Sequence, residues 1–111
     1  MIVHRNDIAV EQLDKKITRR ILNHSPSLMI AEMHFKEGGV GEPHSHTDHE
    51  QMGYVIKGSF SVLLGEETKK LKAGDSFYAA KNIRHGVTAL EDSVLLDIFT
   101  PRRNDYLQTI P

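Results

Sequence analysis

The sequence predicts an all-β fold in one domain spanning residues 1–111, and three observations support this prediction. Apolar residues recur mostly in short runs, which is typical of strands rather than of amphipathic helices. Glycine, aspartate and proline separate these runs and supply the turns. A chain of 111 residues is long enough to bury a core without disulfides. Together these observations favour a closed or sandwiched barrel.

Each expected strand ends at or near one of these turn signals. Gly58, Gly65 and Gly74 suit turns because glycine adopts the positive φ angles that other residues resist. Helical turns are expected only in residues 7–16 and 104–107. The eight expected strands are residues 17–22, 28–35, 51–56, 59–64, 68–71, 76–79, 86–90 and 94–99.

Composition and charge exclude several classes of function. Fourteen Lys and Arg against 15 Asp and Glu give a net charge of -1, which argues against a nucleic-acid partner. The absence of cysteine leaves histidine, glutamine and carboxylates as the metal-binding side chains. No apolar run approaches the roughly 20 residues of a membrane span, and the N-terminus lacks the apolar core of a signal peptide. We therefore expect a cytoplasmic protein without a membrane partner.

Histidines concentrate in one short stretch and recur once far downstream. Residues two apart on a strand share a face, so His44 and His46 would address the same ion. Gln51, following a turn, and His85, from a later strand, would complete three imidazoles and one amide oxygen with coordination positions left open. This donor set accepts Zn, Ni, Fe or Mn alike. The sequence thus predicts a divalent metal ion as cofactor.

Two motifs spanning residues 38–89 resemble those of the cupin superfamily. They read Gly38-x5-His44-x-His46-x4-Gln51-x6-Gly58 and Gly74-Asp75-x4-Ala80-x-Asn82-x2-His85. The chain departs from the family pattern where Gln51 replaces glutamate, Ala80 proline, Asn82 glycine and Ala89 asparagine. The resemblance implies a cupin jelly-roll (double-stranded β-helix) barrel whose strands deliver His44, His46, Gln51 and His85 into its interior.

Other residues near these motifs offer competing ligands. His49 is a possible substitute, although we expect it to lie outside the site because its turn must reverse the chain before Tyr54. Glu50 competes with Gln51, but counting six residues back from Gly58 favours Gln51, and strand alternation turns Glu50 away. Three isolated histidines are expected to have no metal-binding role: His4, His24 and His34.

A closer resemblance, to the pectin degradation cupins, rests on three phrases, of which the C-terminal one separates this group from cupins in general. They are His46-x2-His49-Glu50-Gln51-x2-Tyr54-Val55-Ile56-x-Gly58, residues 89–97, and Phe99-x-Pro101-x-Arg103-x-Asp105-Tyr106-Leu107. That group converts 4,5-unsaturated monouronates, released from pectin or alginate, into linear 5-keto uronates. The positions that match its working residues are Asp97, Phe99 and Arg103.

The residues themselves give partial support to these three assignments. Alternation places Asp97 on the same strand face as Leu95 and Phe99, which favours the cavity over solvent. Burial would raise the pKa of Asp97 and a nearby cation would lower it, and the sequence leaves this open. Arg103 would capture a substrate carboxylate through its planar fork, or it could be a solvated surface residue. Phe99 could simply fill the barrel.

We therefore expect a metal-dependent enzyme acting on a small sugar acid by general acid and base catalysis. The alternatives are a cupin resembling aromatic polyketide cyclases, a dioxygenase cupin, and a non-catalytic module that binds a sugar acid. A homodimer formed through a sheet is also expected.

Overall fold

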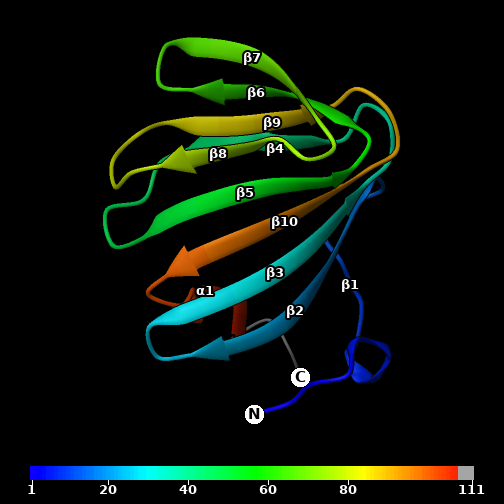
Figure 1. The fold of residues 1–111 in the computed structure, drawn as a ribbon, viewed down its shortest axis with the longest axis vertical. Helices are drawn as coiled ribbons and strands as arrows, with labels where there is room; N and C mark the ends of the chain where they lie inside the picture. The colour runs from blue at the N-terminus through cyan, green and yellow to red at the C-terminus, as the bar shows by residue number, and fades with distance from the viewer. Residues whose placement is uncertain (108–111) are drawn as a thin grey trace.

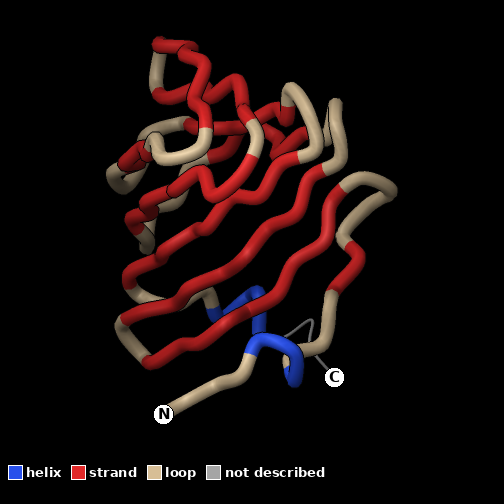
Figure 2. Tube along the Cα trace, turned by 45° about the vertical axis from the view of Figure 1, so that its right-hand side comes forward, coloured by secondary structure: helices blue, strands red, loops and turns tan. Residues whose placement is uncertain are grey.

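The computed structural model describes residues 1–107, which fold into strands with very little helix (Figure 1). Helical turns are confined to η1 (Arg5–Asp7) and α1 (Asn104–Leu107), near the two ends of the trace (Figure 2). Neither is long or apolar enough to cross a membrane. The described strands are β1 (Glu11–Gln12), β2 (Ile17–Ser25), β3 (Leu28–Phe35), β4 (Val40–His44), β5 (Glu50–Lys57), β6 (Ser59–Leu64), β7 (Glu67–Lys72), β8 (Ser76–Ala79), β9 (His85–Ala89) and β10 (Ser93–Thr100).

The strands form two antiparallel sheets, and most neighbours within a sheet are distant in the sequence. The larger sheet has the order β1-β2-β3-β10-β5-β8, and the smaller has the order β4-β9-β6-β7. The chain thus crosses repeatedly between the sheets, as in a jelly roll. The predicted all-β jelly-roll fold is confirmed.

The sequence prediction missed two strands and misassigned one segment. Strand β4 was not expected because Gly41 and Pro43 interrupt its pattern and most of its residues are exposed. Residues 7–16, expected to hold a helical turn, contain only the end of η1, and the two residues of β1 pair with β2. The helical turn expected at residues 104–107 is present as α1. Each of the eight expected strands overlaps an observed one.

The core lies between the sheets and continues into the floor of a cavity. Along β10 the side chains of Leu95, Asp97 and Phe99 are buried, whereas Leu96 and Ile98 lie on the outer face and remain partly exposed. Burying a large apolar side chain contributes about 1.5–3 kcal/mol. The largest fully buried side chains are Phe60, Phe99, Met29, Leu95 and Val55. One carboxylate therefore lies on the apolar inner face of the central strands.

Candidate metal centre and its cavity

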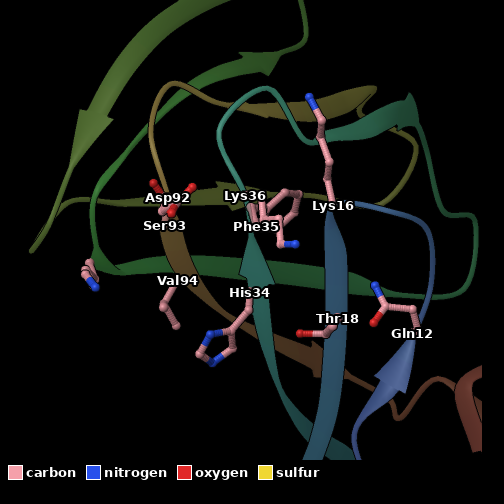
Figure 3. Close-up of a pocket in the computed structure, with 10 residues that line it drawn as sticks. Gln12, Lys16, Thr18, His34, Phe35, Lys36, Asp92, Ser93 and Val94 are labelled. Carbon is pink, nitrogen blue, oxygen red and sulfur yellow. The ribbon is translucent and has the colours of Figure 1, made fainter.

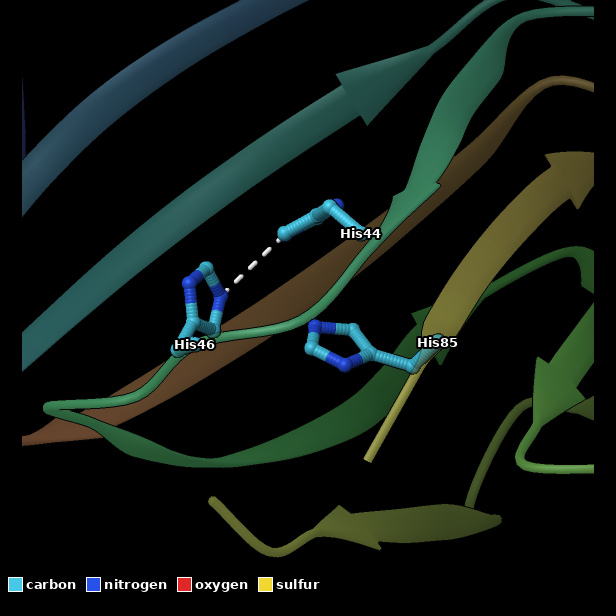
Figure 4. A group of neighbouring side chains, drawn as sticks. All are labelled: His44, His46 and His85. Carbon is cyan, nitrogen blue, oxygen red and sulfur yellow. Dashed lines mark hydrogen bonds between the residues drawn. The ribbon is translucent and has the colours of Figure 1, made fainter. Parts of the chain in front are cut away.

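Three histidine side chains meet where β4 and β9 approach each other (Figure 4). His44 ends β4, His85 begins β9, and the two are paired across the sheet. His46 lies in the following loop, so the expectation that His44 and His46 share a strand face is wrong. The loop turns His46 back instead, and the N–H of Asn82 donates to its carbonyl at 2.6 Å. One ring nitrogen from each histidine lies within 4.8 Å of the others.

Asn82 also shows why one departure from the cupin motif is tolerated. Its φ angle is 67°, in the left-handed region where the motif usually has glycine. Asparagine is among the few other residues that enter this region readily. The turn before His85 is therefore preserved.

Backbone carbonyls fix which nitrogen of two imidazoles faces the site. Nδ1 of His44 lies 2.7 Å from the carbonyl of Glu42, and Nδ1 of His85 lies 2.9 Å from that of Ile83. A carbonyl only accepts, so each Nδ1 is the protonated nitrogen and each Nε2 presents a lone pair. A backbone partner of this kind is typical of metal-binding histidines.

Gln51 adds a fourth donor to this group. Its side chain, 6% exposed on β5, donates from Nε2 to Oδ1 of Asp97 at 2.9 Å, which turns Oε1 toward His85. Oε1 lies 3.1 Å from Nε2 of His85, and Nε2 of His44 lies 3.1 Å from Nε2 of His46. The facing lone pairs of Gln51 and His85 have no hydrogen between them. A cation would satisfy this arrangement, and the nitrogen and oxygen donors suit a divalent metal.

The two competing ligands lie apart from this group. Glu50 points to the outer face of the sheet, where it accepts a hydrogen bond from the hydroxyl of Tyr78 at 3.0 Å. The His49 ring centroid is 5.5 Å from that of His46, and His49 does not belong to the converging group. His34 likewise has a different role, since its Nε2 lies 2.6 Å from Oε1 of Glu32.

Two of the imidazoles, those of His46 and His85, are held in the neutral form that metals require. Burial lowers the pKa of His46 to about 4, and the charge of Arg103 and the neighbouring histidines add to this effect. Burial also lowers the pKa of His85, although the Ile83 carbonyl opposes it. Both rings are therefore neutral near pH 7, with lone pairs available to a cation.

A cavity of about 240 Å³ extends from the histidines into the barrel. Asp97, 7% exposed, lies in its wall, and burial raises the pKa of this carboxyl to about 7. The hydrogen bond from Gln51 and the charge of Arg103 oppose this effect without overcoming it. The sequence left open whether burial or a nearby cation dominates the pKa of Asp97, and in the structure burial dominates. A carboxyl with this pKa can accept and donate a proton near neutrality.

Arg103 approaches the histidines with one nitrogen only. Nη1 lies 3.4 Å from Nε2 of His46 and donates to the hydroxyl of Tyr106 at 3.1 Å. The expected fork is turned away, because Nε and Nη2 donate to Asp105 at 2.9 and 2.6 Å. The neighbouring Arg102 points elsewhere and binds Asn104.

Two aromatic rings lie beside Arg103, and one of them, Tyr106, lines the cavity. Phe99, 1% exposed, places its ring centroid 6.4 Å from that of His46 and 5.5 Å from that of Tyr106. Tyr106 lines the cavity, with the guanidinium carbons of Arg19 and Arg103 lying 3.8 and 4.1 Å from its ring centroid. Tyr106 was not predicted to have a role. The signal for it was its position three residues after Arg103, because residues three apart share a face in a helical turn.

A second hollow, of about 280 Å³, lies away from the histidines and shows no converging chemistry (Figure 3). The ammonium group of Lys16 points away from His34, which also lines the hollow. Asp92 accepts the backbone N–H of Glu37 at 2.8 Å. The candidate site is therefore the cavity beside His44, His46 and His85.

Comparisons with known proteins agree with this fold. Residues 31–99 match the family described as "Cupin domain". The chain is 46% identical over 98 residues to the pectin degradation protein KdgF of Dickeya dadantii, covering 87% of this chain and 89% of that protein. The structure of KdgF from Halomonas sp. superposes with a TM-score of 0.92 at 39% identity, covering 96% of this chain and 99% of the other. An RmlC-like cupin from Shewanella frigidimarina gives a TM-score of 0.87 at 32% identity, covering 91% and 90%.

Proposed function

This chain belongs to the cupin domain family, and from that membership and the geometry of its cavity we propose that it is a metal-dependent enzyme of uronate breakdown. The proposed reaction converts 4,5-unsaturated monouronates into linear 5-keto uronates. The similarity to two KdgF proteins supports the pectin context. The observation that carries the reaction type is the buried Asp97, whose pKa is about 7 and which Gln51 links to the histidine group.

The proposed cofactor is a divalent ion such as Zn, Ni, Fe or Mn, held by His44, His46, His85 and Gln51. None of these ligands carries a negative charge, so the set favours an anionic substrate oxygen. When bound, the ion would supply Lewis-acid stabilisation of negative charge that develops on that oxygen.

In the proposed reaction Asp97 moves one proton. Its carboxylate takes the proton from the anomeric hydroxyl as the bond between C1 and the ring oxygen breaks, which leaves an aldehyde at C1 and an enolate at C5. The resulting carboxylic acid returns the proton to C4, and C5 becomes a ketone. Reactant and product are isomers, so no redox partner is required. The raised pKa of Asp97 suits both steps.

Arg103 and the cavity walls serve binding in this scheme. Nη1 of Arg103, beside His46, can donate to the uronate carboxylate or to the adjoining oxygen. Phe99 and Tyr106 limit access of water from that side. A polyketide cyclase, RemF from Streptomyces resistomycificus, shares the fold at 22% identity and a TM-score of 0.76. An aromatic polyketide would not require a cation such as Arg103, which favours the uronate.

The test is a spectroscopic assay with purified protein. Protein prepared without chelators or a nickel column is analysed for metal, then mixed with an unsaturated monouronate. We expect the ultraviolet absorbance of the C4=C5 bond to fall faster than in the spontaneous reaction, and chelation to remove the difference. An unchanged rate with fully metal-loaded protein would overturn the proposal.

We also propose that two copies pair through the outer face of the larger sheet. One cross-strand row of this face is apolar across four strands: Tyr78, Met52, Ile98 and Ile30. The exposed fractions of Met52, Tyr54 and Tyr78 are 53%, 44% and 46%, and contiguous apolar surface of this kind marks interfaces. Glu50 and Lys57 mark opposite ends of β5. A two-fold axis perpendicular to the strands would place each Glu50 against Lys57 of the second copy.

Sedimentation measurements of charge variants test this pairing. We expect a dimer for the native chain, a weaker dimer for Glu50→Lys and for Lys57→Glu, and recovery in the double variant. A monomer at all concentrations, or no recovery in the double variant, would contradict the proposed interface.

A further inference from the structure

We propose that Asp105 is a positioning residue, which fixes the guanidinium of Arg103 so that Nη1 alone addresses an anionic substrate oxygen beside His46. This inference rests on the proposed function, because it assigns the source of anion recognition in the same cavity. Asp105 itself faces the solvent side, with 58% of its side chain exposed, against 11% for Arg103. It therefore acts through Arg103 rather than on the substrate.

The hydrogen bonds leave the guanidinium one orientation. Asp105 engages two nitrogens at once, from Nε to Oδ1 at 2.9 Å and from Nη2 to Oδ2 at 2.6 Å. Two parallel bonds of this kind fix the plane of the group as well as its distance. Nη1 is the nitrogen farthest from the carboxylate, and it lies 3.4 Å from Nε2 of His46.

Tyr106 restrains the guanidinium further, through both its ring and its hydroxyl. Its ring centroid is 4.1 Å from the guanidinium carbon of Arg103, and its hydroxyl accepts from Nη1 at 3.1 Å. The same ring also contacts Arg19, whose guanidinium carbon lies 3.8 Å from its centroid. Arg19 is in turn paired with Glu11 of β1 through two contacts of 3.1 Å. Segments near both ends of the chain thus hold Arg103 in place.

A rival role for Asp105 makes the opposite kinetic prediction. A carboxylate on the fork of Arg103 occupies the position that a substrate carboxylate would take if it bound in the bidentate manner expected from the sequence. In that case Asp105 would compete with the substrate, and its removal would strengthen binding. If Asp105 positions Nη1, its removal weakens binding because the guanidinium gains orientations that do not face the site.

The decisive variant is Asp105→Asn, with Asp48→Asn as its matched control. Asp48 and Asp105 both line a surface hollow beside Arg103, and the two side chains have the same charged group, so the Asp48 variant reports the general loss of a carboxylate. We expect Asp105→Asn to raise KM about tenfold, the size of one charge-assisted hydrogen bond, and to leave kcat within about threefold. The control should change neither. An unchanged or lowered KM in Asp105→Asn would overturn the inference.

A double variant shows whether Asp105 acts through Arg103. In an Arg103→Gln background, the change Asp105→Asn should add nothing to KM, because the group that it orients is gone. Equal effects in both backgrounds would mean that Asp105 acts independently. Thermal unfolding of Asp105→Asn should match the native protein, since exposed ion pairs contribute little to stability.

A binding measurement separates this inference from the proposed reaction. Saturated galacturonate is an unreactive probe, and its affinity for the zinc-loaded protein can be measured by calorimetry. We expect weaker binding to Asp105→Asn than to the native protein and to Asp48→Asn. This result would support the positioning role even if the unsaturated uronate were not converted. Equal affinities would refute the role, whatever the outcome of the rate assay.

Discussion

The two halves of the site are built from different kinds of backbone, and this determines what each half can tolerate. Gln51, Asp97 and Phe99 come from β5 and β10, regular strands in the middle of the larger sheet. His46 and Arg103 come from segments that have left the sheets. Side chains of the first half are both core and site, so stability and chemistry are coupled there. Side chains of the second half are not among the buried core residues, so chemistry there is less tightly coupled to stability.

Register and exposure show this difference directly. Gln51 pairs with Phe99 across the β5 and β10 ladder, and both are buried, at 6% and 1% exposed. His44 is exposed at the very end of β4, and His46 is half-buried in the loop that follows. Changes in the sheet half should therefore alter folding, whereas changes in the loop half should alter metal or substrate binding with little effect on folding.

The largest effect is expected from His46→Ala in the loop half. Losing the partner of a metal ligand costs about 10-fold to 100-fold in affinity, so losing a ligand itself should cost more than about 100-fold. We expect conversion of the uronate to fall to the spontaneous rate. The unfolding temperature of the metal-free variant should equal that of the native protein, because the side chain is not in the core. Calorimetric metal titration and thermal unfolding check the two parts.

Ser45→Ala is the control for this variant, since Ser45 is exposed between His44 and His46 and does not belong to the histidine group. It should keep the metal affinity of the native protein. A metal-free His46→Ala protein that unfolds several degrees lower would contradict the separation of the two halves.

Asp97→Asn in the sheet half should change rate and stability in opposite directions. Loss of the acid and base should lower kcat by about 100-fold to 10,000-fold. The folded pKa of Asp97, about 7, lies above its unfolded value of about 3.9, so its contribution to stability is present below pH 4 and is lost as the pH rises through 7. Asparagine stays neutral at every pH and therefore loses no stability in this way. The metal-free variant should therefore be more stable than the native protein at pH 8.

The comparison at pH 4 serves as the internal control for Asp97→Asn. There both side chains are neutral, and Gln51 can donate to either, so the unfolding temperatures should converge. A stability difference independent of pH would show that Asp97 is not buried as a neutral acid.

The same division separates what the sequence could predict from what it could not. In β10 the alternation of apolar residues placed Asp97 on the buried face beside Leu95 and Phe99, as observed. Regular strands have a period of two, so a side chain's face follows from its position in the sequence. The approach of His85 to His44 and His46 followed from motif spacing rather than from periodicity.

The loop half could not be predicted from local pattern. His46 reaches the site through a turn that the carbonyl contact with Asn82 stabilises, and no strand carries it. The fork of Arg103 faces Asp105, the carboxylate two residues further along the chain. A prediction based on the alternation of side chains in a strand does not consider such a local partner. Strand β4 was missed for a related reason, since Gly41 and Pro43 hide a segment that is mostly exposed.

Gln51→Glu in the sheet half adds a charge with little change in the shape of the side chain. Gln51 donates to Asp97 from Nε2, and a glutamate would place two carboxyl groups in contact. We expect one of them to remain protonated, with the pKa of the pair raised further. The metal-free variant should lose about 1–3 kcal/mol of stability at pH 8, and metal should restore part of it. Urea unfolding with and without zinc measures both.

The negative ligand should also weaken the preference for an anionic substrate. We expect kcat/KM to fall about tenfold, because the added charge opposes development of an enolate. An unchanged stability in the absence of zinc would mean that residue 51 and Asp97 do not share a hydrogen bond.

Gly53→Ala, expected to have the smallest effect, tests whether the sheet half is under packing constraint. Gly53 pairs with Asp97 across the ladder, and a methyl group there would lie 2.2 Å from the ring of Phe77. The ring belongs to the core and must shift, which should cost about 1–3 kcal/mol of unfolding free energy. Metal affinity should stay unchanged because the histidines are not displaced.

The double variant with Phe77→Leu should lose less unfolding free energy than the sum of the two single variants, since the smaller side chain makes room for the methyl. Additive losses would mean that Phe77 is not the obstacle, and a change in metal affinity would mean that the two halves are not separable.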